Sequence, residues 1–99
     1  RRLLFLLLFA VPAAAQTVPP RGSDATFDVA AWNVTFFGYP SAGPSNDVLQ
    51  RQNVGAVVRQ AGIDLWAMQE MTDTAAWQTL LADLAADGYA GVLGPSVSS

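Results

Sequence analysis

The sequence predicts an α/β fold whose elements follow the order β-α-β-α-β. Two apolar runs rich in β-forming residues, 26–34 and 63–69, are each followed by a segment whose apolar side chains recur at helical spacing. Gly62 and Gly88 stand just beyond these two segments, where glycine commonly ends a helix. Strands that alternate with helices favour a layered fold, because each amphipathic helix must bury its apolar side against a sheet.

The first strand is expected over residues 26–34, where β-formers dominate and polar and apolar residues alternate loosely. Residues 36–45 contain two Pro and two Gly and are expected to form a loop. Ser45 or Asn46 then caps a helix that runs to about Gln60. One side of this helix carries an apolar stripe formed by Val54, Val57, Val58 and Ala61.

The second strand, residues 63–69, is almost continuously apolar and is therefore expected at a central position in the sheet. Thr72 or Asp73 caps the second helix, and a short third strand is expected over residues 89–93, after Gly88. The long apolar strands and three Trp predict a sheet covered on both faces. The buried side of the second helix is expected to hold Trp77, Leu80, Leu81 and Leu84.

Residues 1–15 have the pattern of a secretory signal peptide whose start codon is missing: two Arg, a short apolar run and three Ala. Cleavage is expected after Ala15, and residues 16–25 are expected to be a linker. A transmembrane anchor is the alternative, but an anchor requires about 20 apolar residues and this run stops at Pro12. The absence of cysteine excludes a lipid-modified cysteine. We therefore expect a secreted or periplasmic protein without a stable membrane anchor.

The chain without its first 15 residues is acidic, with three Arg against eight Asp and Glu and no Lys or His, which gives a net charge of −5. Such a surface does not attract polyanions by its own field, because non-specific affinity for nucleic acids comes from basic groups. A phosphate substrate would therefore have to be held by a metal ion or by residues that this chain lacks. No disulfide can contribute to the fold, since the chain has no cysteine.

Asn33 and Glu70 end the two strand-like runs and are the candidate site residues. The carboxyl ends of neighbouring strands converge in α/β folds, and ligands bind there. An amide beside a carboxylate suits a hard divalent cation and a phosphate. Each residue also has a structural alternative: Asn33 opens a turn, and Glu70 is a solvated acid beyond the strand. Asp64 is expected to be a solvated turn residue, and Trp32 and Trp66 are expected to pack in or beside the core.

The segments Val-Ala-Ala-Trp-Asn-Val (29–34) and Asp-Leu-Trp-Ala-Met-Gln-Glu-Met (64–71), with Phe37-Gly38 and a helix between them, carry a family resemblance. This pattern resembles the start of the endonuclease/exonuclease/phosphatase superfamily, which includes pancreatic-type deoxyribonucleases, abasic-site endonucleases, inositol polyphosphate phosphatases and sphingomyelinases. The separation of 37 positions between Asn33 and Glu70 also agrees with that family. The resemblance implies that residues 26–99 are the incomplete N-terminal part of a deoxyribonuclease-like, four-layered α/β sandwich.

By position, the resemblance implies that Glu70 holds the catalytic divalent metal and that Asn33 lies beside the metal and the scissile phosphate. Both residues are therefore expected at a catalytic metal site, and Gln69 is expected to orient Glu70. Oxygen ligands favour Mg²⁺, with Mn²⁺ or Ca²⁺ as alternatives. Thr35 stands where the abasic-site branch usually has an acid, which argues against abasic-site repair.

The implied function is a secreted, metal-dependent phosphodiesterase, with an endonuclease that hydrolyses nucleic-acid phosphodiester bonds as the favoured form. The family supplies a histidine and aspartates from later strands, so the 99 residues alone are expected to be inactive. Two alternatives remain: a non-catalytic exported binding module of the same fold, or a phosphatase-type or sphingomyelinase-type phosphoesterase. The expected partner is nucleic acid or another phosphodiester substrate. The oligomeric state stays open, with a monomer as the expectation.

Overall fold

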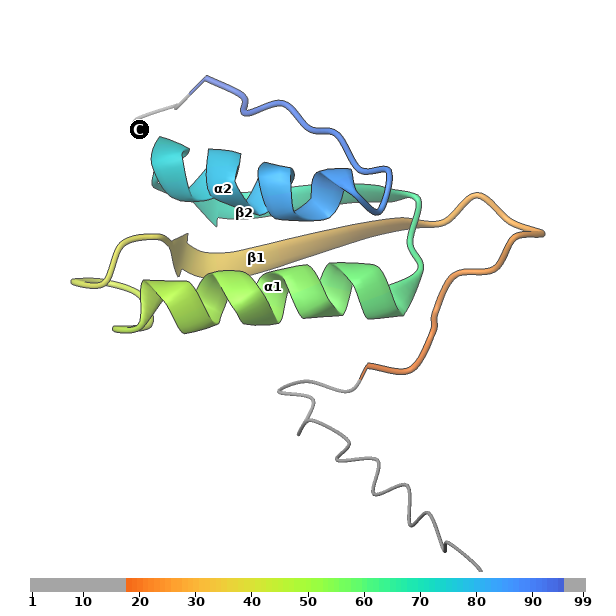
Figure 1. Ribbon diagram of the computed structural model, residues 1–99, viewed down its shortest axis with the longest axis horizontal. Helices are drawn as coiled ribbons and strands as arrows, with labels where there is room; N and C mark the ends of the chain where they lie inside the picture. Colours follow the sequence, from red (N-terminus) through yellow and green to blue (C-terminus); the bar gives the residue numbers. More distant parts are fainter. Residues whose placement is uncertain (1–17, 96–99) are drawn as a thin grey trace, which may run out of the picture.

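Strands β1 (Val29–Phe37) and β2 (Leu65–Met71) lie side by side as a parallel pair, connected by helix α1 (Asp47–Ala61) and followed by helix α2 (Thr74–Ala85). The computed structural model describes residues 18–95, which form a small α/β domain of order β-α-β-α (Figure 1). The expected pairing of the first two strands is confirmed. The predicted signal peptide, residues 1–15, lies outside the described residues.

Short polar side chains and one glycine set three of the four helix ends. Asn46 accepts a hydrogen bond from Leu49 N at 3.0 Å where α1 begins, and Asp73 accepts one from Ala76 N at 2.8 Å where α2 begins. The sequence left two candidate caps open for each helix, and the structure identifies Asn46 as the cap of α1 and Asp73 as the cap of α2. Gly62 ends α1 with a left-handed φ of 64°, as predicted.

Strand β1 begins later and extends further than the sequence predicted. The expected loop over residues 36–45 is wrong at its start, because the strand continues to Phe37, whose side chain is only 1 % exposed. The carbonyl of Phe37 accepts hydrogen bonds from Thr72 N at 3.2 Å and Thr72 Oγ1 at 2.8 Å. These bonds and the burial of its ring hold Phe37 in the sheet.

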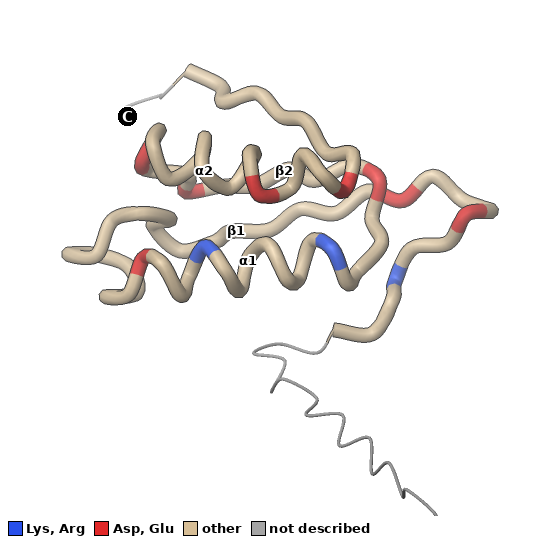
Figure 2. The backbone as a smooth tube through the Cα atoms, in the orientation of Figure 1, with Lys and Arg blue, Asp and Glu red and all other residues tan. Residues whose placement is uncertain are grey.

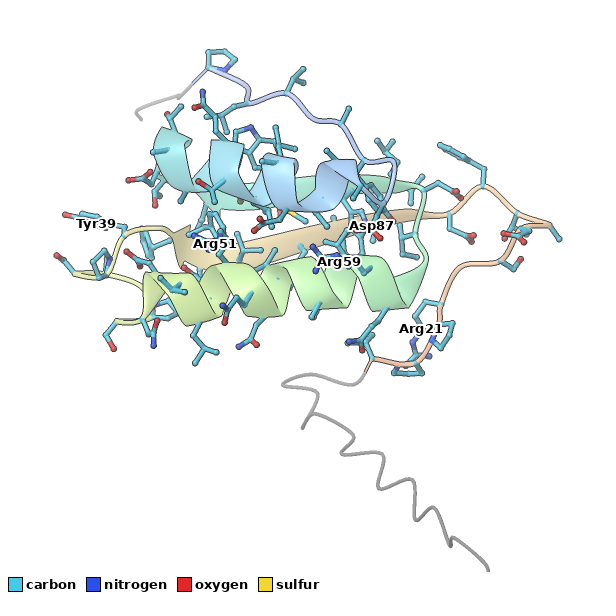
Figure 3. All side chains as sticks on the ribbon, viewed as in Figure 1. Arg21, Tyr39, Arg51, Arg59 and Asp87 are labelled. Atoms are coloured by element: carbon cyan, nitrogen blue, oxygen red, sulfur yellow. The ribbon has the colours of Figure 1, made fainter. Side chains whose placement is uncertain are left out.

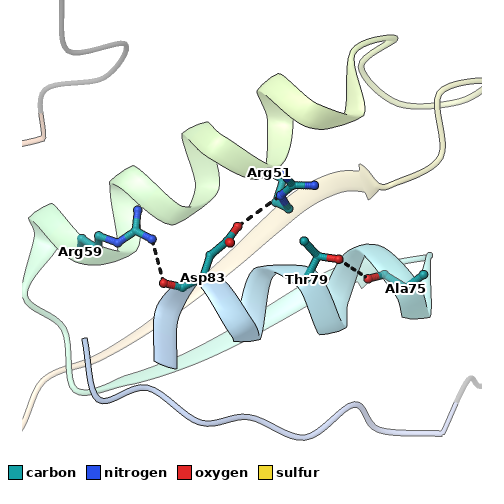
Figure 4. Close-up of polar contacts among 5 residues, drawn as sticks. All are labelled: Arg51, Arg59, Ala75, Thr79 and Asp83. Carbon is teal, nitrogen blue, oxygen red and sulfur yellow. Dashed lines mark hydrogen bonds and ion pairs between the residues drawn. The ribbon is translucent and has the colours of Figure 1, made fainter. Parts of the chain in front are cut away.

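Both helices pack on the same face of the sheet, and Figure 4 shows them together in front of the two strands. Burial alternates along the strands, so that Trp32 and Val34 of β1 and Trp66 and Met68 of β2 contribute to the packed face. The core combines residues from β1, α1 and α2: Val34, Phe37, Val54, Val58, Leu80 and Leu84.

The other face of the sheet is exposed within residues 18–95. Val29 is 59 % exposed and Leu65 is 52 % exposed, so the expectation of a sheet covered on both faces is not met in this part of the chain. The connection between parallel strands places α1 on one face. Helix α2 then packs beside α1 rather than opposite it.

One ion pair joins α1 to α2, and a second joins α1 to Asp87 just after α2 (Figures 3 and 4). Arg59 Nε donates to Asp87 Oδ2 at 2.8 Å, and Arg59 Nη2 donates to the carbonyl of Asp83 at 3.0 Å. Arg51 Nε lies 3.2 Å from Asp83 Oδ2, without the alignment of a hydrogen bond. All four side chains are partly exposed, so these pairs contribute little to stability and mainly fix the position of α2 beside α1.

The third strand expected over residues 89–93 is not formed among the described residues. Tyr89 Oη donates to the carbonyl of Ile63 at 2.7 Å, and Gly91 lies close to the side chains of Trp77 and Leu81 on α2. The segment therefore follows α2, as Figure 1 shows, and its backbone is not paired with β2. β-forming residues alone do not determine which surface a segment covers.

The predicted linker, residues 16–25, is described from residue 18 and forms no helix or strand there. It nevertheless lies against the end of α1, because Arg21 N and Gly22 N both donate to the carbonyl of Ala61, at 2.9 and 3.0 Å. Val18 N also donates to Gln60 Oε1 at 2.7 Å. This segment thus satisfies the carbonyl of Ala61, one of the groups that a helix end leaves without partners.

We expect Leu80→Ala to lower the free energy of unfolding by about 3 kcal/mol, because Leu80 is fully buried and its removal leaves a cavity in the core. Urea unfolding of the full-length chain measures this loss. Leu49→Ala is the control, since Leu49 is 44 % exposed and the same truncation should change stability by less than about 0.5 kcal/mol. Equal losses in the two variants would contradict the packing of α2 described here.

Candidate functional site

The carboxyl ends of the two strands carry an irregularity that centres on Glu70. The strands pair regularly as far as Asn33 opposite Gln69, and pairing resumes at Phe37 opposite Met71. Between these two pairs β1 contains three residues, whereas β2 contains only Glu70. The extra residues of β1 form a bulge that faces Glu70, and bulges occur frequently beside functional sites because they redirect side chains.

Asn33 and Glu70 bind two consecutive backbone N–H groups of this bulge. Asn33 Oδ1 accepts a hydrogen bond from Thr35 N at 2.9 Å, and Glu70 Oε2 accepts one from Phe36 N at 3.0 Å. Adjacent backbone nitrogens lie within one residue length of each other, so the two oxygens are no more than about 10 Å apart. The two residues selected from the sequence are therefore held against the same turn. Glu70 lies next to the end of β2, as expected, but Asn33 lies in the middle of β1, because β1 continues to Phe37.

The backbone around these contacts adopts conformations that side chains disfavour. Thr35, Phe36 and Glu70 have φ values of 55°, 47° and 61°, and they are the only residues other than glycine with positive φ in the part of the chain that the structure describes. A left-handed conformation costs roughly 1–2 kcal/mol for such a residue. Strained backbone clusters at functional sites, where the surrounding structure maintains it.

Both candidate residues keep free polar groups. Glu70 Oε1 and Asn33 Nδ2 have no hydrogen-bond partner among residues 18–95. Glu70 is half-buried and Asn33 is exposed. A free carboxylate oxygen is a ligand for a hard cation, and a free amide N–H is a donor for a phosphate oxygen. The Asn33 amide oxygen is already engaged in the turn, which leaves it one lone pair for a metal.

Gln69 does not orient Glu70 as expected. Gln69 is exposed, and its Nε2 donates to the carbonyl of Ala67 at 3.3 Å on its own strand. The residue before Glu70 turns to the open face of the sheet because side chains alternate along a strand. The hydrogen bond to the Glu70 carboxylate comes instead from the backbone of Phe36.

The other side chains selected from the sequence have structural roles. Trp32 and Trp66 pack against the core with ring centroids 6.0 Å apart, as expected. Asp64 is exposed at the opposite end of β2 from Glu70, and its Oδ2 accepts a hydrogen bond from Asp28 N at 2.7 Å. Asp64 thus repeats the carboxylate-to-backbone contact of Glu70 at the other end of the same strand.

Gln50 belongs to the site and was missed in the sequence. It is 8 % exposed on α1, and its side-chain amide bonds to the backbone of Val34, Thr35 and Gly38. Gln50 precedes Val54 and Val58 by one and two helical turns, so it occupies the apolar stripe of α1. The sequence did contain an indication of this role. A glutamine at helical spacing with buried apolar residues is itself expected to be buried, and a buried amide needs hydrogen-bond partners.

The position after Phe37 can hold only glycine without strain. Gly38 has a φ of 79°, and a Cβ atom there would lie 2.6 Å from Asp73 Cβ and 2.8 Å from Ala76 Cβ. The start of α2 therefore leaves no room for a side chain. Gly38 thus allows the chain to leave β1 beside the end of β2.

Two hollows flank the sheet. One of about 590 Å³, between β2, α2 and residues 89–94, has an apolar lining that includes neither Asn33 nor Glu70. The other, of about 630 Å³, lies between β1, α1 and the loop that joins them, and Asn33, Thr35 and Gln50 line it. The second hollow therefore reaches the bulge beside Asn33, whereas Glu70 lines neither hollow.

Within residues 18–95 no group of three or more Asp, Glu, His or Cys side chains is arranged to hold a metal ion. The candidate site thus offers a single carboxylate, from Glu70, and an amide, from Asn33, that are bound to the same turn. Comparison of the chain with protein-family models, curated proteins and solved structures found no match.

Thr35→Gly should raise the free energy of unfolding by about 1 kcal/mol, because glycine adopts the left-handed conformation without the steric cost that a β-branched residue incurs. Thr35→Ala is the matched control: it removes the same hydroxyl and methyl groups but keeps Cβ, so no comparable gain is expected. Thermal and urea unfolding of the two variants measure the difference. Equal stability of the variants would show that the backbone at Thr35 is not strained.

Proposed function

We propose that this protein is a secreted, metal-dependent phosphodiesterase, with an endonuclease acting on nucleic acid as the favoured form of the activity. The observation that supports it is the bulge of β1, whose consecutive N–H groups bind Asn33 of β1 and Glu70 near the carboxyl end of the parallel strand β2. The resemblance of the segments around these two residues to the endonuclease/exonuclease/phosphatase superfamily supplies the class of reaction.

The residues fit a divalent cation of the Mg²⁺ type. Such a cation is commonly held by one or two carboxylates, keeps several water ligands and binds substrate phosphate. Glu70 offers a free carboxylate oxygen, and its other oxygen is fixed by Phe36 N. A bound Mg²⁺, or Mn²⁺ or Ca²⁺ in its place, would neutralise charge on the phosphoryl group. In this proposal Glu70 holds the cation, and Asn33 donates from Nδ2 to a phosphate oxygen.

We further propose that residues 26–99 belong to a four-layered α/β sandwich of the deoxyribonuclease type, as its N-terminal part. The exposed face of the sheet supports this proposal, because Val29 and Leu65 are large apolar residues that a second sheet would cover. A two-stranded sheet is also marginal by itself, and additional strands would pair with its open edges. Substrate choice would then depend on segments beyond the residues described here.

Glu70→Gln in the full-length protein should reduce cleavage of a phosphodiester by about a hundredfold or more, because the amide removes the negative charge that holds the cation. The free energy of unfolding should change by less than about 1 kcal/mol, since the amide oxygen still accepts from Phe36 N. Cleavage of supercoiled plasmid DNA and of bis(4-nitrophenyl) phosphate with Mg²⁺ or Mn²⁺ measures the first effect, and urea unfolding measures the second.

Asp64→Asn is the matched control, because Asp64 accepts a backbone hydrogen bond at the other end of the same strand. Its turnover should equal that of the wild type. Turnover of 4-nitrophenyl phosphate in place of the diester would favour a phosphatase, and metal binding without any turnover would favour a non-catalytic binding module. Equal turnover by Glu70→Gln and wild type at saturating Mg²⁺ would rule out the proposed role of Glu70.

We also propose that residues 1–15 direct export and are removed. No helix within residues 18–95 is long and apolar enough to span a membrane. The exported protein is expected to begin at Gln16 or within a few residues of it, because the Ala-rich end of the segment suits signal peptidase. N-terminal sequencing or mass spectrometry of the exported protein measures this. Mature protein that still contains Leu3 to Leu8 would contradict the proposal.

A further inference from the structure

Gln50 is the only buried polar side chain among the residues that the structure describes. It lies on the apolar stripe of α1, where Val54 and Val58 pack in the core. A buried amide is unfavourable unless its donors and acceptor are satisfied. The structure therefore has to provide specific partners for Gln50, and their identity indicates its role.

The partners of Gln50 determine how its amide is oriented. Nε2 donates to the carbonyls of Val34 at 2.9 Å and Thr35 at 3.1 Å, and Oε1 accepts from Gly38 N at 3.1 Å. Carbonyl oxygens only accept and the backbone N–H only donates, so the opposite orientation of the amide would break all three hydrogen bonds. Gln50 thus binds the bulge on both sides of Phe36.

The same peptide groups that Gln50 binds also bind the candidate site residues. The peptide group between Val34 and Thr35 accepts from Gln50 at its carbonyl and donates to Asn33 Oδ1 at its N–H. The next peptide group accepts from Gln50 and donates to Glu70 Oε2. Because a trans peptide group is planar and directs its C=O and N–H to opposite sides, each peptide group is held between Gln50 and one site residue.

We propose that Gln50 is a positioning residue that fixes these two peptide groups and, through them, the side chains of Asn33 and Glu70 for binding a divalent cation. This inference rests on the proposed metal-dependent function. Hydrogen bonds to the two carbonyls also polarise the N–H groups on the opposite side, which strengthens their bonds to Asn33 and Glu70. Gln50 itself touches neither the cation nor the substrate.

The test compares Gln50→Met with Gln52→Met in the full-length chain. Methionine preserves the length of the side chain and removes its hydrogen bonds, and Gln52 is an exposed glutamine on the same helix. Mn²⁺ is the probe, and its dissociation constant is measured from the paramagnetic broadening of the Phe36 and Glu70 amide signals. Gln50→Met should raise the dissociation constant about tenfold, as expected for a residue that orients a metal ligand. Gln52→Met should leave it unchanged.

Combining the Gln50 and Glu70 substitutions distinguishes a positioning role of Gln50 from a general effect of Gln50 on the stability of the fold. In a Glu70→Gln background, Gln50→Met should cause a smaller loss of Mn²⁺ affinity than in the wild type, because Gln50 acts in part through Glu70. Amide hydrogen exchange provides a readout without metal: exchange at Thr35 and Phe36 should accelerate at least about tenfold in Gln50→Met, while amides in the β1–β2 ladder keep their protection. If Gln50→Met does not fold, Gln50→Asn, which keeps the amide but is too short for all three bonds, replaces it.

The possible results distinguish the two proposals. A wild type whose Phe36 and Glu70 signals are not broadened by Mn²⁺ would overturn the proposed function, while faster exchange at Thr35 and Phe36 in Gln50→Met would still support the ordering role of Gln50. A wild type that binds Mn²⁺, with unchanged affinity in Gln50→Met, would overturn the positioning role alone. Equal loss of affinity from Gln50→Met with and without Glu70 would also overturn it.

Discussion

The arrangement at the strand ends depends on the mismatch in length between β1 and β2. Pairing must resume at Phe37 because its ring is buried and its carbonyl binds Thr72. Three residues of β1 therefore have to fit opposite Glu70 alone. Left-handed conformations at Thr35 and Phe36 accommodate the excess. The N–H sides of the two peptide groups bind Asn33 and Glu70, and their carbonyl sides bind Gln50.

The hydrogen bonds around the bulge are comparable in energy with its strain. Three left-handed residues other than glycine cost roughly 1–2 kcal/mol each. Five hydrogen bonds act on the bulge and on Gly38, and each contributes about 1 kcal/mol net. The two sums are similar, so the hydrogen bonds of Gln50, Asn33 and Glu70 offset much of the strain in the bulge.

Features with local causes could be predicted from the sequence, and features with tertiary causes could not. Asn46, Asp73 and Gly62 set helix ends through their own side-chain and backbone chemistry, so their positions were predictable. The bulge was not, because Thr35 and Phe36 favour extended backbone and no glycine marks the turn. Gln50 was overlooked because its partners come from another element. Residues 89–93 have strand-forming composition, but Tyr89 and the contact of Gly91 with α2 direct them elsewhere.

The charged residues of the described part indicate what a bound cation would contribute to substrate binding. Figure 2 shows the basic residues of the described part on α1 and on the segment before β1. Arg51 and Arg59 are paired with acids of the α2 region, and the backbone of Arg21 binds the last turn of α1, at the opposite end of the domain from Glu70. Both arginines of α1 therefore already lie against acidic side chains. A phosphodiester approaching Glu70 would meet a negative charge, and repulsion between the two would oppose binding. A divalent cation bound by Glu70 reverses that charge, so the same carboxylate that repels the substrate alone would help to bind it when metal is present.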